Sequence, residues 1–286
     1  MNSGTSSLKT STSSLGANRV AVAGTGMVGG ALAKFLNNPI LYDPPKGIGS
    51  VNELNKADII FICVPTPYTE NGCDTSTVEK VVKELKGNKI IVIKSTVIPG
   101  TTDRLQEKFP KHKFLFNPEF LTEETSDQDM KYPDRQIIGY TCESYDVAGE
   151  IMMLLPAAPF ERIITASEAE MVKYYGNTWF ATKVVFANQI YDLCEKIGIN
   201  YDTVKEAVSY DKRIGRSHLN VWHKGYRGYG GKCLPKDTKA LIKFADQNRV
   251  DMSLLKETDS INEKLCSNQS VKPKNTETFH TANSRI

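Results

Sequence analysis

Short apolar runs alternate with helix-like segments through the first half of the chain. Several intervals between these runs are long enough to hold a helix, which indicates βαβ units and a parallel sheet. The pattern therefore predicts an α/β fold in which a doubly wound parallel sheet occupies residues 18–165. The runs that we expect to form buried strands are rich in Val, Ile and Phe: Arg19–Ala23, Ile40–Tyr42, Ile59–Val64, Lys89–Lys94 and Phe114–Phe116.

Beyond these runs the pattern becomes helical, and we expect an all-helical central domain over residues 166–266. A long segment without proline, Ser167–Lys196, opens with the capping box Ser167-x-x-Glu170 and stops at Gly198. Its apolar content predicts a homodimer built on this helix; the alternative is a core helix within a monomer. The apolar residues in question are Trp179, Phe180, Val184, Val185 and Ile190. Further helices are expected at Tyr201–Ser209, Asp237–Asn248 and Ser253–Leu265.

Composition narrows the class of protein. A hydrophobic content of 40% and a charged content of 24% are typical of a soluble globular protein, and a net charge of +3 without a basic patch argues against nucleic acid and membrane partners. Six cysteines without metal-ligand spacing predict no metal site and a reducing, cytoplasmic compartment. The Ser/Thr-rich residues 1–17 are expected to be a flexible lead-in rather than a secretion signal, and residues 267–286 a disordered tail.

A dinucleotide fingerprint opens the chain. The strand ending at Ala23 leads into Gly24-Thr25-Gly26-Met27-Val28-Gly29, which matches G-x-G-x-x-G before a helix. In such a loop Gly24 permits the turn, Gly26 admits the pyrophosphate and Gly29 lets helix and strand pack closely, with the phosphates at the helix N-terminus. Asp43 ends the next strand and is expected to bond the ribose hydroxyls and repel a 2′-phosphate. These features predict a Rossmann-like domain that binds NAD in preference to NADP.

A cysteine stands in a glycine-rich loop about two hundred residues later. The segment Gly228-Tyr229-Gly230-Gly231-Lys232-Cys233 is followed by Lys236 and Asp237. A thiol beside a cation ionises more readily into a nucleophile, and the carboxylate lies near enough to act as a base. The loop predicts covalent catalysis at Cys233; a partly buried thiol without a catalytic role is the alternative.

With five further segments, this loop resembles the UDP-glucose/GDP-mannose dehydrogenase family over about Arg19–Leu265. The segments occur in the family's order: Val64-Pro65-Thr66-Pro67, Lys94–Thr102, Asn117–Glu123, Asp134–Gly139, and Lys173 with Asn177. The resemblance implies an NAD-dependent four-electron oxidation, in which the C6 alcohol of a nucleotide sugar such as UDP-glucose becomes a carboxylate, as in polysaccharide biosynthesis.

The resemblance also implies roles for individual residues. Cys233 would attack the aldehyde and carry a thioester, while Asp237, Thr96 and Glu119 would hold and activate the hydrolytic water. Lys173 and Asn177, four positions apart on one helix, would stabilise an oxyanion. The expected cofactor contacts are Gly24, Gly26, Met27, Val28, Gly29, Asp43, Val64, Pro65, Thr66, Ser95, Thr96 and Glu123. The expected substrate contacts are Glu119, Phe120, Leu121, Lys173, Asn177, Gly230, Lys236 and, across a dimer interface, Arg213.

The chain also departs from the family's pattern. Family members continue into a second nucleotide-binding domain that this chain lacks, so a separate chain is a candidate to supply it. The connection between Asp43 and Val64 is short, and the loop Arg216–Arg227 carries an unusual set of aromatic residues. Two other functions stay open: a two-electron dehydrogenase of the β-hydroxyacid type, which needs no Cys233, and a non-catalytic NAD-binding homologue.

Overall fold

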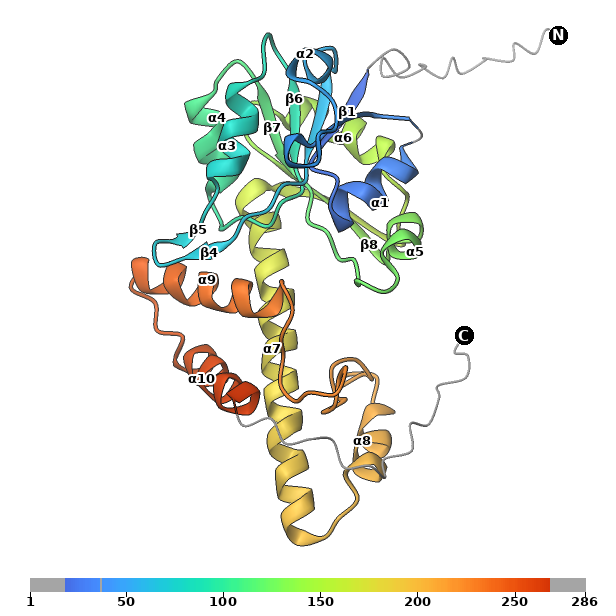
Figure 1. Ribbon diagram of the computed structural model, residues 1–286, viewed down its shortest axis with the longest axis vertical. Helices are drawn as coiled ribbons and strands as arrows, with labels where there is room; N and C mark the ends of the chain where they lie inside the picture. Colours follow the sequence, from blue (N-terminus) through green and yellow to red (C-terminus); the bar gives the residue numbers. More distant parts are fainter. Residues whose placement is uncertain (1–18, 37, 268–286) are drawn as a thin grey trace, which may run out of the picture. The chain divides into compact units, whose positions relative to one another are not determined.

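The computed structural model describes residues 19–36 and 38–267 (Figure 1). The predicted flexible segment, residues 1–17, lies outside these ranges, as does the predicted tail except for its first residue, Ser267. By its internal contacts the chain divides into two units, one that ends at Tyr174 and one that begins at Tyr175. The division falls within a single long helix, α7 (Ala166–Ile197). The domain boundary that we placed between residues 165 and 166 stays a prediction.

The first unit is built on one sheet. Within the described residues this sheet has seven strands in the order β2-β1-β3-β6-β7-β8-β9, and neighbours are parallel except β7 and β8. The chain winds away from β1 in both directions, through β2 on one side and β3 on the other, and α/β sheets bind ligands at such switch points. The strands are β1 (Val20–Ala23), β2 (Ile40–Tyr42), β3 (Ile59–Ile62), β6 (Ile90–Ile93), β7 (Lys113–Phe116), β8 (Arg135–Tyr140) and β9 (Phe160–Thr165).

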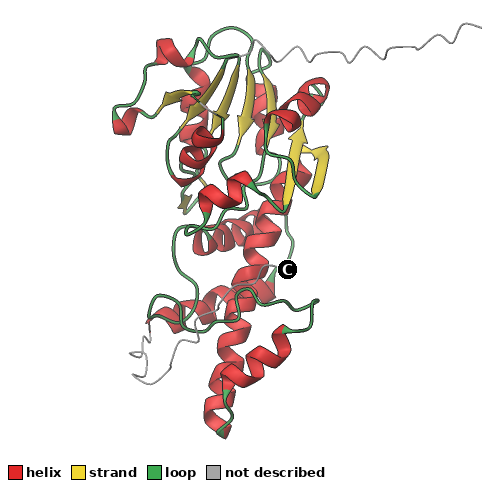
Figure 2. Ribbon diagram, turned by 90° about the vertical axis from the view of Figure 1, so that its right-hand side faces the viewer, coloured by secondary structure: helices red, strands yellow, loops and turns green. Residues whose placement is uncertain are grey.

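Helices cover both faces of the sheet (Figure 2). One buried cluster joins the sheet to α1 (Met27–Phe35), α5 (Ser126–Lys131) and α6 (Tyr145–Leu154). A second cluster joins the other face to α2 (Val51–Leu54), α3 (Ser76–Lys83), α4 (Thr101–Lys108) and the start of α7. The predicted doubly wound α/β fold followed by a helical region with one long helix is therefore confirmed. A short 3-10 turn (Pro44–Lys46) and the hairpin β4 (Tyr68–Thr69) and β5 (Gly72–Cys73) complete the unit.

The expected capping box at the start of α7 is wrong. The helix begins at Ala166, and the contact at its start is made two residues before Ser167 by Thr165, whose backbone N–H and hydroxyl both donate to Glu168 at 2.9 and 2.7 Å. Ser167 instead donates to Asp103 at 2.8 Å, and Glu170 accepts hydrogen bonds from the start of α4. Both sequences fit the pattern S/T-x-x-E, so tertiary contacts decided which one caps α7.

The second unit is helical. The part of α7 from Tyr175 onward packs Ala181, Val184 and Val185 against Tyr229, and a smaller cluster forms around Cys194 further along. The helices α8 (Tyr201–Ser209), α9 (Leu234–Gln247) and α10 (Ser253–Ser267) follow. Two apolar residues that we had assigned to a dimer surface, Val184 and Val185, are thus buried inside this unit.

Gly139 in β8 is packed closely against the start of α7. A Cβ atom built on Gly139 would lie 2.7 Å from the Cβ of Ala169 and 2.9 Å from the Cα of Ala166. We expect Gly139→Ala to lower the free energy of unfolding by about 1–3 kcal/mol, as overpacking does, in urea titrations. Gly149→Ala on α6, where a Cβ would meet nothing within 4 Å, is the control and should stabilise by about 0.5–1 kcal/mol. Equal effects of the two changes would contradict the packing argument.

Candidate active site

The glycine fingerprint lies between the end of β1 and the start of α1. A Cβ on Gly24 would lie 2.5 Å from the carbonyl oxygen of Cys63, and one on Gly29 would lie 1.9 Å from that of Gly24, so protein packing demands both glycines. Gly26 differs, because its φ is −69° and a Cβ there would meet nothing within 4 Å. Neither backbone nor packing requires glycine at position 26. Close approach of a bound dinucleotide explains it, so these residues fit NAD.

Asp43 faces this loop from the end of β2. Its Oδ2 accepts hydrogen bonds from the backbone N–H and the hydroxyl of Thr25 at 2.8 and 2.7 Å. Lys46 Nζ lies 3.6 Å from the same oxygen and donates to the carbonyl of Thr25 at 2.6 Å. Burial alone would raise the pKa of Asp43, but the bonds from Thr25 and the Lys46 ammonium outweigh burial and hold the pKa below its ordinary value. The carboxylate that would read the ribose is therefore charged and fixed in place.

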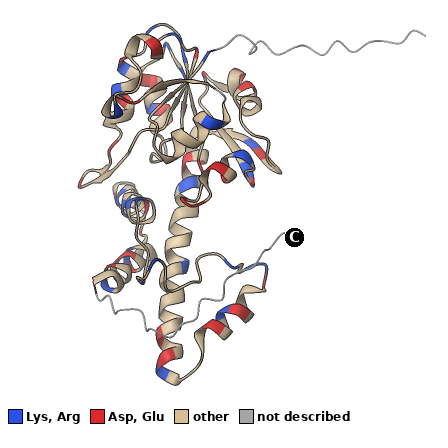
Figure 3. Ribbon diagram, turned by 45° about the vertical axis from the view of Figure 1, so that its right-hand side comes forward, with Lys and Arg blue, Asp and Glu red and all other residues tan. Residues whose placement is uncertain are grey.

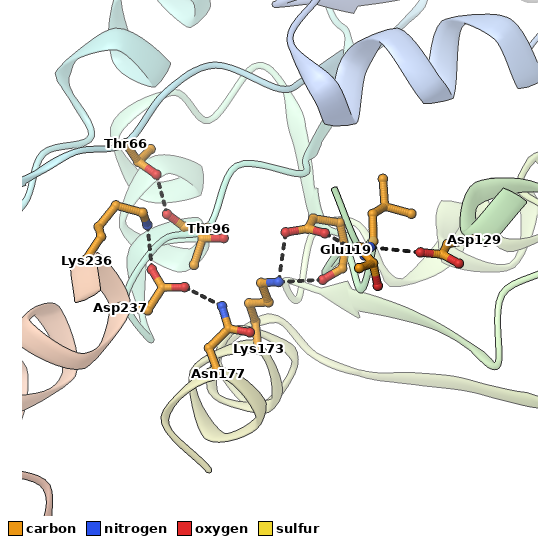
Figure 4. Close-up of polar contacts among 10 residues, drawn as sticks. Thr66, Thr96, Glu119, Asp129, Lys173, Asn177, Lys236 and Asp237 are labelled. Atoms are coloured by element: carbon orange, nitrogen blue, oxygen red, sulfur yellow. Dashed lines mark hydrogen bonds and ion pairs between the residues drawn. The ribbon is translucent and has the colours of Figure 1, made fainter. Parts of the chain in front are cut away.

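Four predicted residues meet where β3 and β6 end. The Ser95 hydroxyl donates to the carbonyl of Val64 at 2.7 Å, and the Thr66 hydroxyl donates to the carbonyl of Thr96 at 2.6 Å (Figure 4). Because Ser95 and Thr66 are buried, these bonds fix the backbone of both loops. Thr96 is half-buried, and its own hydroxyl takes part in neither of these two bonds.

Lys173 and Glu119 form a buried ion pair in the first unit. The Lys173 ammonium lies 2.8 Å from Glu119 Oε1 and donates to the Glu119 carbonyl at 2.8 Å, and each side chain is 7% exposed (Figure 4). Burial alone would raise the pKa of Glu119, but attraction to Lys173 and the N–H of Leu121 outweigh it and lower the pKa. The lowered pKa favours the charged form of Glu119, and the ion pair fixes the position of the Lys173 side chain.

The sequence analysis missed two cations of this unit. Lys94 directly follows the apolar strand β6, is 4% exposed and donates to Asn117 at 2.5 Å; burial lowers the pKa of its ammonium. Arg135 stacks on the ring of Phe120, with its guanidinium 3.8 Å from the ring centroid. A charged residue at the end of a wholly apolar run was the available signal for Lys94.

The second unit brings three predicted residues together around one carboxylate. Asp237 is 1% exposed and accepts hydrogen bonds from Asn177 Nδ2 and Lys236 Nζ, both at 2.5 Å (Figure 4). Exposed Cys233 is the N-cap of α9, and the N–H of Asp237 donates to its carbonyl at 2.9 Å. One helical turn therefore separates a thiol from a hydrogen-bonded carboxyl group, at a helix end whose dipole favours negative charge.

Lys173 and Asn177, expected to act as a pair, have different partners. Lys173 binds Glu119, whereas Asn177 binds Asp237. Arg213 also has a partner close in sequence, because its guanidinium makes a bidentate pair with Asp211 while 90% of its side chain is exposed. Of the other predicted contact residues, Met27 and Val28 lie in the first turn of α1, and Pro65, Glu123 and Gly230 lie outside the helices and strands.

Two further properties of the described residues concern the requirements of a metal site and of a membrane-spanning helix. In residues 19–36 and 38–267, no three His, Cys, Asp or Glu side chains are grouped so that they could hold a metal ion. None of the helices in this part of the chain is both long and apolar enough to span a bilayer. Charged residues of both signs are scattered over each unit (Figure 3).

Comparison with known proteins identifies the family. Residues 49–153 match the NAD binding domain of the UDP-glucose/GDP-mannose dehydrogenase family, and residues 167–264 match its central domain. The chain therefore belongs to this family, as its motifs indicated, and the predicted cofactor NAD is confirmed by the match to the NAD binding domain.

Named relatives are similar over most of the chain. A UDP-glucose 6-dehydrogenase of Rickettsia prowazekii is 37% identical over 232 residues, which are 77% of this chain and 52% of that protein. One of Bacillus subtilis is 36% identical, over 73% of this chain and 49% of its own length. A UDP-glucose dehydrogenase structure from Pyrobaculum islandicum aligns with a TM-score of 0.77 and 28% identity, over 90% of this chain and 70% of that one. The chain spans about half the length of the curated relatives it matches.

The Asp43 geometry predicts how cofactor affinity changes. We expect Asp43→Ala to weaken NAD binding by about tenfold to a few hundredfold, because the lost hydrogen bonding to a charged group is worth about 1.5–3 kcal/mol in total. Affinity for NADP should fall less, since repulsion of the 2′-phosphate is lost as well. Calorimetric titration with both dinucleotides measures this preference. Asp127→Ala, which removes an exposed carboxylate paired with Lys34 of α1, is the control. Unchanged affinity for both cofactors would remove Asp43 from the site.

Proposed function

We propose that the chain catalyses the NAD-dependent oxidation of the C6 alcohol of a nucleotide sugar, with UDP-glucose the first candidate, to the uronic acid. The observation that carries the proposal is the Cys233–Asp237 turn, in which the carboxylate is oriented by Asn177 and Lys236. A dehydrogenase that stops after the first two-electron oxidation needs neither the thiol nor a base for thioester hydrolysis. The names of the relatives, UDP-glucose 6-dehydrogenases, support the substrate.

In the proposed reaction, different residues act in the two oxidation steps. Bound NAD supplies a hydride acceptor in each of two oxidations. Lys173, held by Glu119, offers an ammonium that stabilises negative charge on the C6 oxygen as the alcohol gives its proton to solvent water. The Cys233 thiolate adds to the aldehyde carbon to form a thiohemiacetal, and loss of a second hydride from that carbon leaves a thioester.

Hydrolysis of the thioester then needs a base. Asp237 is oriented by its two donors, so its carboxylate can accept a proton from the attacking water, and we assign the Thr96 hydroxyl as a further partner for that water. Carboxylate leaves as Cys233 regains its thiolate. For each alcohol, one water is consumed and two hydrides are transferred, which balances a four-electron oxidation.

The stoichiometry tests the proposal against its alternatives. The chain should form two NADH for each UDP-glucose consumed, measured by absorbance and by chromatography of the product. One NADH per sugar would favour the two-electron dehydrogenase, and none with a panel of nucleotide sugars would favour a non-catalytic NAD-binding protein. Full activity that appears only when a second polypeptide is added would support a partner chain.

The thioester step predicts the behaviour of a cysteine variant. Cys233→Ser should abolish uronic acid formation while leaving NAD affinity nearly unchanged, because the fingerprint residues are intact. An ester trapped on the introduced hydroxyl would appear as a mass increase in the intact protein. Cys142→Ser, at another exposed cysteine, should keep full activity. If Cys233→Ser made carboxylate at the wild-type rate, the covalent mechanism would be wrong.

We also propose that two copies associate through α7. Tyr175, Trp179, Phe186, Leu193 and Ile197 are all at least 55% exposed, and their spacings of four and seven residues put them on one side of the helix. The middle of this helix carries few charges (Figure 3). Of the residues named from sequence, Trp179 belongs to this stripe. Exposed Arg213, with its fork held by Asp211, is the candidate to reach the partner's substrate.

Mixing inactive variants tests the shared site. Arg213→Ala and Cys233→Ala chains should each be inactive, but an equal mixture should regain up to about a quarter of wild-type activity, since about half of the dimers are then hybrids and one of the two sites in each hybrid has both groups. Sedimentation at micromolar concentration checks that hybrids form. A monomer, or hybrids that form without regaining activity, would contradict the proposal. Phe186→Ser should weaken self-association, whereas Tyr145→Ser, an equally exposed aromatic residue outside α7, should not.

A further inference from the structure

One buried carboxylate of the first unit has no part in the reaction proposed above. Glu170 lies in the first turns of α7 and is 0% exposed. Its Oε1 accepts hydrogen bonds from the backbone N–H and the hydroxyl of Thr102 at 2.8 and 2.6 Å, and its Oε2 accepts one from the N–H of Gly100 at 2.7 Å. Three donors from one short segment thus converge on one carboxylate.

The segment that Glu170 binds is the start of α4. The N-cap of α4 is Gly100, which has no side chain to cap the helix and adopts φ +87°. The first N–H groups of a helix need acceptors, and a negative charge there interacts favourably with the helix dipole. Glu170 therefore supplies from a distant helix the cap that the local sequence of α4 lacks.

The same segment closes the loop that carries Thr96. This loop leaves β6 at Ile93 and ends at Gly100, and the Thr66 hydroxyl holds it near its middle through the Thr96 carbonyl. Lys173, three residues after Glu170, binds Glu119 beyond the neighbouring strand β7. Residues three apart lie on one side of a helix. The start of α7 is thus tied to the loops that follow two adjacent strands.

We propose that Glu170 is a positioning residue, which fixes the loop of Thr96 relative to the helix that presents Lys173. The inference rests on the proposed function, because both of these residues act there on the reacting sugar. A polar group misplaced by about 1 Å can cost about a hundredfold in rate. The role of Glu170 is therefore in turnover, beyond its contribution to stability.

Protonation of Glu170 should loosen this anchor. Burial and the charge of nearby Asp103 raise the pKa of Glu170, against the opposing hydrogen bonds from Thr102 and Gly100, to about 7. Asp103 itself accepts a hydrogen bond from Ser167. Because folded Glu170 binds its proton more tightly than the unfolded chain does, its contribution to stability falls as the pH rises from about 4.5 to about 7. The fully charged acceptor for Gly100 and Thr102 exists above that range.

The experiment compares three single variants in the full chain. Glu170→Gln presents an amide N–H₂ to one of the backbone donors, and Thr102→Val removes only the hydroxyl donor. We expect Glu170→Gln to lower kcat about tenfold to a hundredfold with little change in KM for the nucleotide sugar, and Thr102→Val to lower kcat less. Glu168→Gln is the matched control, since Glu168 is an exposed carboxylate on the same turn that binds only Thr165, and its kcat should stay at the wild-type value.

Amide signals provide the readout that does not depend on turnover. In the wild-type chain the amide resonances of Gly100 and Thr102 should titrate with a midpoint near pH 7, and Glu170→Gln should abolish this titration and speed hydrogen exchange at both amides. Wild-type kcat in Glu170→Gln, an equal loss in Glu168→Gln, or unchanged hydrogen exchange at both amides in Glu170→Gln would overturn the inference. If the wild-type chain reduces no NAD with any nucleotide sugar, the proposed function fails, and the amide measurements still decide whether Glu170 anchors the loop.

Discussion

Buried charge must be paired, and the start of α7 is organised by this requirement. Lys173 and Glu170 project from its first turns into the first unit, where Lys173 meets Glu119 and Glu170 meets the uncapped start of α4. Removing one partner of such a buried pair costs about 3–5 kcal/mol, because the other charge is left without compensation. The contacts of Lys173 and Glu170 therefore fix the positions of the loops after β6 and β7.

In the proposed reaction the same charged groups take part in the chemistry. An ammonium ordered by a carboxylate, as Lys173 is by Glu119, needs little reorganisation when negative charge develops on a substrate oxygen. In the second unit, Asn177 and Lys236 order Asp237 in the same way, one turn after Cys233. In each unit the interactions that stabilise the fold also keep a reactive group oriented.

The strands illustrate how far pattern analysis reaches. The five apolar runs predicted β1, β2, β3, β6 and β7, because strands buried on both faces are continuously apolar. The two strands β8 and β9 were missed. Arg135 and Gln136 open β8, and Glu161 and Arg162 lie in β9, which is exposed at the edge of the sheet. Without a buried face on each side, an edge strand has no such signature.

The sequence by itself determined the family, the cofactor and the residue types of the site, because glycine spacing and motif order are local properties that survive in the linear chain. Only the tertiary structure decided which groups meet. Glu119 precedes Lys173 by 54 positions and Asp237 follows Asn177 by 60, so no local rule links them. Glu170 is the clearest case. Its sequence context indicated a cap for its own helix. In the folded chain its buried carboxylate instead lies at the start of α4, where it accepts three hydrogen bonds.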